Sequence, residues 1–116
     1  MAFPFTASTV INPGNAVIIS GANTVGTVAT NGSAAALGFA VTAAANAGDT
    51  VWVATAGIIT NAVSGGTIAT AASVCTSSNG AGRVYSCTTV GAVIGKALTG
   101  TSGAGQTLSV VVWNGR

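Results

Sequence analysis

Charged side chains are nearly absent from this 116-residue chain, which has three Lys or Arg residues and one Asp or Glu residue. Globular domains ordinarily devote about 25% of their residues to charge, and charged surfaces keep soluble monomers apart. A surface that is apolar and poor in charge usually marks contact with another molecule. We therefore expect neighbouring subunits to cover much of this surface, as in a larger assembly.

Histidine and glutamate are absent, and Asp49 is the only acidic residue. Without histidine, a serine or cysteine nucleophile lacks its usual base, and a single carboxylate cannot form an acid–base pair. Two cysteines alone cannot complete a four-ligand zinc site. We therefore expect no catalytic residues, no metal site and no cofactor, and the chain is not expected to be an enzyme.

Long apolar runs are also missing, because Gly, Thr and Ser interrupt every stretch well before the ~20 residues of a membrane-spanning helix. The net charge of +2 is spread over single residues and forms no basic stripe for phosphates. The opening sequence MAFPFTASTV has no basic region ahead of an apolar segment, as a secretory signal would. We expect neither a membrane nor a nucleic acid as partner.

What the chain does contain is a series of short β-branched runs bounded by Gly, Asn and Ser, the pattern of strands and turns. This pattern predicts an all-β fold, a single-domain antiparallel β-sandwich or a barrel-like fold, with no helix required. The expected strands are Ala16–Ser20, Thr24–Ala29, Leu37–Thr42, Thr50–Thr55, Gly57–Ala62, Thr67–Ala72, Val74–Thr76, Arg83–Thr88, Val93–Thr99 and Thr107–Trp113.

One stretch occurs twice, since residues 37–53 align with residues 94–110 at a spacing of 57 positions (94 − 37). The second copy contains the turn-rich segment GTSGAGQ, which excludes a helix, so both copies are predicted to be β-hairpins. The matched pairs are Gly38 with Gly95, Ala40 with Ala97, Thr42 with Thr99, Ala47 with Ala104, Gly48 with Gly105, Thr50 with Thr107 and Val53 with Val110.

The turn of each predicted hairpin ends in AGDT or AGQT, at residues 47–50 and 104–107. Gly48 and Gly105 are expected to supply the positive φ that a tight connection needs. Because Gln106 replaces Asp49 in the second copy, we expect the Asp49 carboxylate to serve the turn rather than any chemistry.

The segment VCTSSNGAGRVYSC, residues 74–87, reads as a third hairpin with a cysteine near each end. Cys75 and Cys87 could face each other across it and form a disulfide, or remain two reduced, buried residues. Cytoplasmic synthesis favours the reduced form. The residues leave both alternatives open.

The start of the chain differs from the rest, because Phe3 and Phe5 flank Pro4, which favours an extended backbone. We expect residues 1–12 to form an N-terminal arm, folded onto the domain at residues 13–116 or reaching to another subunit. Lys96 is expected at a strand edge, in solvent or against a partner. Trp52 and Trp113 are expected to pack in a core or an interface, with sugar binding as the alternative.

The two repeated segments, LGFAVTAAANAGDTVWVA and IGKALTGTSGAGQTLSVVV, resemble the capsid decoration, or cement, proteins of tailed phages. The shared pattern is a strand of hydrophobic residue, Gly, any residue and Ala, then a small-residue turn with AGD or AGQ, then a Val-rich strand. The resemblance implies a β-sandwich or barrel-like domain that binds outside the assembled shell of the major capsid protein and reinforces it.

On this resemblance the chain is expected in the virion, on the outer surface of the capsid, after synthesis in the host cytoplasm. The partners would be the major capsid protein and other copies of the chain, as a trimer, a dimer or neighbours on the shell. The residues expected at the interface are Phe3, Pro4, Phe5, Lys96 and Trp113. The alternatives are a self-assembling surface or fibre subunit and, less favoured, a small carbohydrate-binding β domain.

Overall fold

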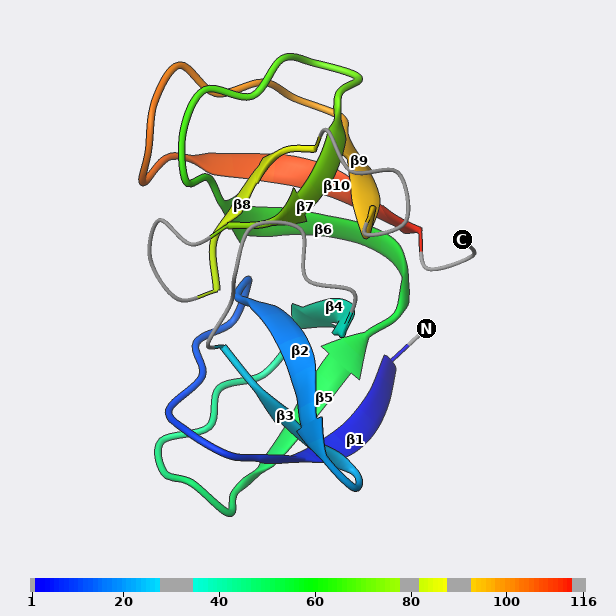
Figure 1. Ribbon diagram of the computed structural model, residues 1–116, viewed down its shortest axis with the longest axis vertical. Helices are drawn as coiled ribbons and strands as arrows, with labels where there is room; N and C mark the ends of the chain where they lie inside the picture. The colour runs from blue at the N-terminus through cyan, green and yellow to red at the C-terminus, as the bar shows by residue number, and fades with distance from the viewer. Residues whose placement is uncertain (1, 28–34, 78–81, 88–92, 114–116) are drawn as a thin grey trace.

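The computed structural model describes residues 2–27, 35–77, 82–87 and 93–113, and in these ranges every regular element is a strand (Figure 1). The all-β fold expected from the sequence is therefore confirmed. The described residues contain no helix long and apolar enough to span a membrane. The strands are β1 (Ala2–Ala7), β2 (Ala16–Gly21), β3 (Thr24–Gly26), β4 (Ala36–Ala40), β5 (Thr50–Ala54), β6 (Ala56–Val63), β7 (Ser73–Thr76), β8 (Val84–Ser86), β9 (Gly95–Ala97) and β10 (Thr107–Trp113).

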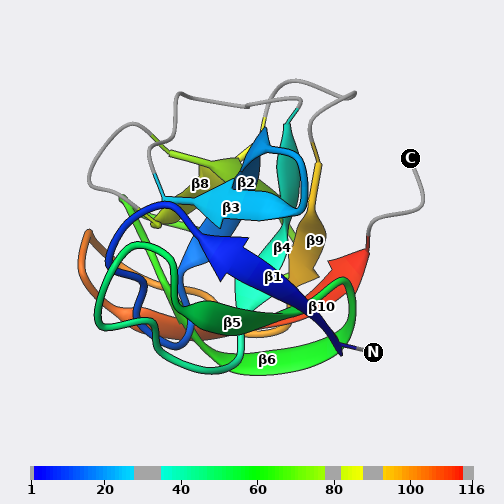
Figure 2. The same cartoon turned by 90° about the horizontal axis from the view of Figure 1, so that it is seen from below.

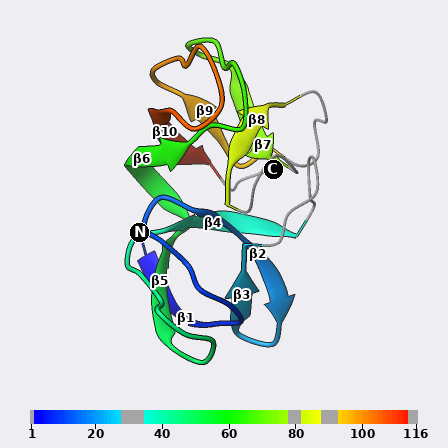
Figure 3. The same cartoon turned by 90° about the vertical axis from the view of Figure 1, so that its left-hand side faces the viewer.

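The first five strands close into a barrel in the order β1-β3-β2-β4-β5, here called the N-terminal barrel (Figure 3). Side chains alternate across its wall, so that Val51 and Val53 are fully buried inside while Trp52 between them is exposed. Small apolar residues fill most of the interior, which is how a chain with few large side chains still builds a core. The interior cluster is Ala7, Ile11, Val17, Val25, Ala40, Ala44, Val51 and Val53.

The last five strands form a sheet in the order β6-β10-β9-β7-β8, here called the C-terminal sheet. This order repeats that of the barrel, read from β1 through β5, β4 and β2 to β3. The parallel β1–β3 pairing that closes the barrel has a counterpart in one parallel bridge between Ser64 and Val84. The repeat therefore extends from the two predicted hairpins, β4–β5 and β9–β10, to all five strands of each half.

Matching hydrogen bonds support the repeat at its spacing of 57 residues. The amide of Gly48 donates to the carbonyl of Ala7 at 2.7 Å, and the amide of Gly105 donates to the carbonyl of Ser64 at 2.8 Å. Further equivalent pairs join Ile11 with Ala44 and Ile68 with Thr101, Val41 with Trp52 and Leu98 with Ser109, and Trp52 with Thr42 and Ser109 with Thr99.

The two turns expected to contain left-handed glycines do so, with φ of 93° at Gly48 and 82° at Gly105. Asp49 acts within its turn, where its carboxylate Oδ2 accepts a hydrogen bond from the Asn46 amide at 3.0 Å. Its counterpart Gln106, with a longer side chain, reaches one residue further back, since its Oε1 accepts from the Ser102 amide at 2.9 Å. The amide oxygen of Gln106 thus replaces one carboxylate oxygen of Asp49 in equivalent turns.

The structure corrects the expected N-terminal arm, because residues 2–7 are β1, a wall of the barrel between β3 and β5 (Figure 2). The backbone extended by Pro4 fits a strand as well as an arm. Pro4 pairs with Trp52 of β5, while the pairing with β3 begins only at Thr6, so the missing proline N–H interrupts no ladder on that side. Deleting residues 1–8 would therefore open the barrel.

The strand expected at Thr67–Ala72 was also wrong. Ile68 forms an isolated bridge with Thr101, and Ala71 has a φ of 71°, which no regular strand accommodates. The equivalent residue in the N-terminal barrel, Gly14, has a φ of 88°. The β-branched residues at 67 and 68 indicated a strand, but this segment is the repeat's long loop.

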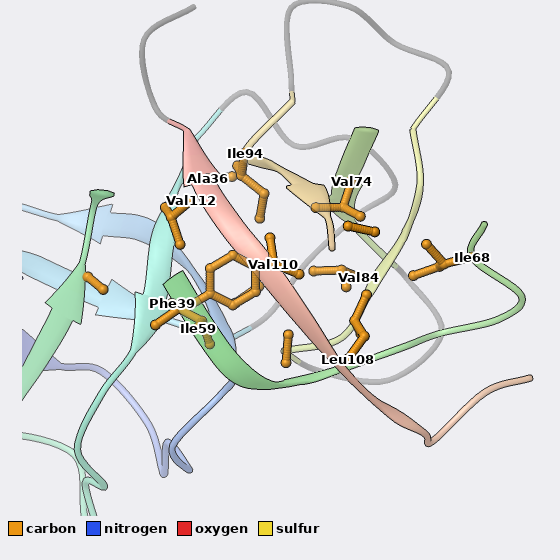
Figure 4. Close-up of a cluster of buried hydrophobic side chains, with 14 residues drawn as sticks. Ala36, Phe39, Ile59, Ile68, Val74, Val84, Ile94, Leu108, Val110 and Val112 are labelled. Carbon is orange, nitrogen blue, oxygen red and sulfur yellow. The ribbon is translucent and has the colours of Figure 1, made fainter. Parts of the chain in front are cut away.

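The barrel and the sheet share a second core, in which Phe39 of β4 is the largest fully buried side chain (Figure 4). Phe39 projects from the outside of the barrel and packs with residues of the C-terminal sheet such as Ile59 and Val110. The backbone also joins the halves, because the Ala16 amide donates to the Gly82 carbonyl at 2.8 Å. The two repeats thus form one body.

Candidate interaction surface

The residues expected at an interface lie on different halves of the molecule. Phe3, Pro4 and Phe5 are on β1 of the barrel, and Phe3 and Pro4 are exposed while Phe5 is half-buried against the barrel interior. Lys96 is exposed on β9 of the C-terminal sheet. Trp113 ends β10, opposite Ala56, but its side chain lies outside the described part of the structure. Strand pairing does not bring these residues together.

The outer side of β4 and β5 carries a row of apolar side chains, here called the β4–β5 face: Phe39, Val41, Trp52 and Ala54. Phe39 pairs with Ala54, and the Val41 amide donates to the Trp52 carbonyl at 2.7 Å, so the four residues form two adjacent cross-strand pairs. The first pair is buried in the core shared with the C-terminal sheet. Val41 and Trp52 remain 47% and 45% exposed.

The equivalent outer side of β9 and β10, here called the β9–β10 face, has Lys96, Leu98, Ser109 and Val111. Its geometry is the same, since Lys96 pairs with Val111 and the Leu98 amide donates to the Ser109 carbonyl at 2.7 Å. Its composition differs, because Lys96 replaces Phe39 and Ser109 replaces Trp52. Lys96 and Leu98 are both exposed, so this face is not covered by the other half.

A shallow hollow on the barrel is lined by Pro4, which pairs with Trp52, and by Phe5, Thr6, Asn23 and Thr50. It lies on the N-terminal side of the first β1–β3 pair, Thr6 with Thr24, next to the turn between β2 and β3. Its lining residues carry no ionisable side chain and no nucleophile other than threonine hydroxyls. The hollow can receive a side chain of a partner but offers no groups for acid–base chemistry.

Cys75 of β7 and Cys87, just beyond β8, form a disulfide with their Cα atoms 5.0 Å apart. Of the two alternatives that the sequence left open, the structure contains the bridge. It joins the two strands of the β7–β8 hairpin, in which Cys75 pairs with Tyr85. The N-terminal barrel has Ile18 at the position equivalent to Cys75, so the bridge belongs to one repeat alone.

Replacing Cys75 and Cys87 together by alanine is expected to lower the free energy of unfolding by about 2 to 3 kcal/mol, because the bridge closes a short loop in the unfolded chain. The midpoint of thermal unfolding should fall by roughly 10 °C. Wild-type protein under reducing conditions should behave like the variant. An unreduced wild-type mass without the two-dalton loss of a disulfide would contradict the bridge.

No family model and no curated protein matches the sequence. The fold, however, is similar to the crystal structure of the head fibre gp8.5 N base of bacteriophage phi29. The similarity covers 98% of this chain and 94% of that chain, with a TM-score of 0.72 and 14% sequence identity. The chain therefore has, over nearly its full length, the all-β fold of a phage head fibre base.

Proposed function

We propose that this chain is a structural protein of a phage head, bound to the outer surface of the assembled shell and reinforcing it. The observation that carries the proposal is the full-length fold similarity to a phage head fibre base. The scarcity of charge supports it independently, because such a surface suits burial against other proteins. The proposed partners are the major capsid protein and neighbouring copies of the chain.

The mechanism is a binding equilibrium without a chemical step. A protein that binds only the assembled shell stabilises that state by its own binding free energy. Once one contact with the shell has formed, its effective concentration favours contacts with neighbouring subunits. Several individually weak interfaces can therefore give stable binding. The two repeats pack as one body around Phe39, which lets a contact on the barrel hold the whole chain in place.

The test is binding of the purified chain to filled heads, to empty expanded shells and to unassembled capsid protein, followed by sedimentation. We expect saturable binding to both assembled forms, little binding to the unassembled protein, and a higher temperature of shell disruption when the chain is bound. Wild-type chain that remains in the supernatant with every shell preparation would contradict the proposal.

The second candidate is a subunit of a fibre attached to the head, and the description of the similar structure as a head fibre base favours it. Because any chain that binds only the assembled shell stabilises it, heat resistance does not separate the two candidates. A self-assembling fibre subunit would form filaments alone by electron microscopy, whereas saturable shell binding by a chain that forms no filaments supports the cement role. Both candidates share the attachment to a phage head.

A further inference from the structure

The β4–β5 face is divided between two environments. Its Phe39–Ala54 pair is covered by the C-terminal sheet, and the next pair along the strands, Val41 and Trp52, is exposed. Because alternate residues of a strand share one side, the exposed pair continues the surface that the buried pair begins. A partner seated on Val41 and Trp52 would therefore extend an interface that already exists within the molecule.

The β9–β10 face shows what the same strands carry when nothing in the described structure covers them. It has the same pairings and the same backbone hydrogen bonds, yet its residues at the equivalent positions include Lys96 and Ser109. The fold therefore does not require tryptophan at position 52. The contrast is specific to these positions, because the second repeat also has exposed apolar side chains, such as Ile58 of β6, which is 64% exposed.

The two halves also differ in their charged residues. Residues 2–54 contain one charged side chain, Asp49, whose carboxylate already accepts a hydrogen bond from its own turn. The described part of the C-terminal sheet carries Arg83 and Lys96. A partner that binds the barrel beside Trp52 would desolvate no charge there, which suits an uncharged apolar surface and disfavours an acidic or basic one.

We propose that Val41 and Trp52, with Pro4 beside Trp52 on β1, are the surface by which the chain binds the shell, and that the β9–β10 face remains in solvent. The inference rests on the proposed function and adds its docking site. The partner is an uncharged, apolar patch of the major capsid protein, with a projecting side chain for the hollow next to Pro4.

The experiment compares three variants for binding to expanded shells: Trp52→Ser, Val41→Ser and the control Leu98→Ser. Leu98 is the equivalent of Val41 and is 45% exposed, against 47% for Val41, so the two serine variants remove similar exposed apolar groups from the same backbone position. Trp52→Ser introduces the residue that the second repeat has at that position. All three side chains are 45% to 47% exposed, so each variant should still unfold cooperatively with a modest drop in thermal midpoint, and binding is compared well below that midpoint.

We expect Trp52→Ser to weaken shell binding roughly tenfold or more, as truncation of a central interface tryptophan does. Val41→Ser should weaken it less, and Leu98→Ser should leave it unchanged. Wild-type binding by both barrel variants would overturn the docking site while the proposed function stands. Failure of the wild-type chain to bind any shell would instead overturn the proposed function.

Self-association is the remaining outcome. If the wild-type chain forms dimers or larger species in sedimentation, and Trp52→Ser abolishes them without changing shell affinity, the occupant of this face is a second copy and the proposal is wrong. Sedimentation of the wild-type chain as a monomer, together with weaker shell binding by Trp52→Ser, supports it.

Discussion

Replacing Phe39 by lysine is expected to lower the free energy of unfolding by about 4 kcal/mol or more. Phe39 is fully buried between the barrel and the C-terminal sheet, and loss of a buried phenylalanine alone costs about 3 to 5 kcal/mol. A buried ammonium group without a partner adds to this cost. The total is a large part of the roughly 5 to 15 kcal/mol that stabilises a domain. Urea unfolding followed by circular dichroism measures it.

The control is the reverse exchange, Lys96→Phe, at the equivalent position of the second repeat. Lys96 is exposed, so its replacement should change the free energy of unfolding by no more than about 0.5 kcal/mol. Lys96→Phe should instead lower the solubility of the protein, because it enlarges an exposed apolar surface. Equal urea midpoints for Phe39→Lys and the wild type would show that the two halves do not pack through Phe39.

Gly38→Ala is expected to cost about 3 kcal/mol. A Cβ atom at Gly38 would collide with the carbonyl oxygen of Ala54 on the neighbouring strand, and backbone cannot move aside as a flexible side chain can. The equivalent Gly95 has the same constraint, since a Cβ there would lie 2.6 Å from the carbonyl oxygen of Val111. Thermal unfolding of Gly38→Ala and Gly95→Ala should show lower midpoints for both.

Gly66→Ala provides the matched control, because a Cβ at Gly66 would meet no atom within 4 Å and the backbone there has no positive φ. The same added methyl group should be neutral or stabilise the fold by up to about 1 kcal/mol, because alanine reduces the conformational entropy of the unfolded chain. A midpoint for Gly38→Ala as high as that for Gly66→Ala would mean that β4 and β5 are not so closely apposed.

The sequence revealed the repeat only where both copies keep the same small residues, as at Gly38 and Gly95. Elsewhere, buried positions of the two halves accept different small side chains. Ala7 and Ser64, for example, occupy equivalent positions but are different residues. In β3 and β8 the spacing also changes, because Val25 and Val84, the parallel partners of Ala7 and Ser64, are 59 positions apart (84 − 25). A strict spacing of 57 misses this pair.

The candidate surface could not be predicted in the same way. Phe39 and Lys96 have the same local pattern around them, yet one is fully buried and the other exposed. The difference comes from how the barrel packs on the C-terminal sheet, which no periodicity encodes. Trp52 was expected in a core or an interface, but only the packing shows that it lies outside the barrel beside a covered pair.

The division of the chain into two consecutive five-stranded units has a consequence for its synthesis. The N-terminal barrel draws all its strands from residues 2–54, so it can close while the ribosome is still making the remainder. At that moment Phe39 faces water on a finished barrel. The nascent protein therefore exposes an apolar side chain until the C-terminal sheet folds against it.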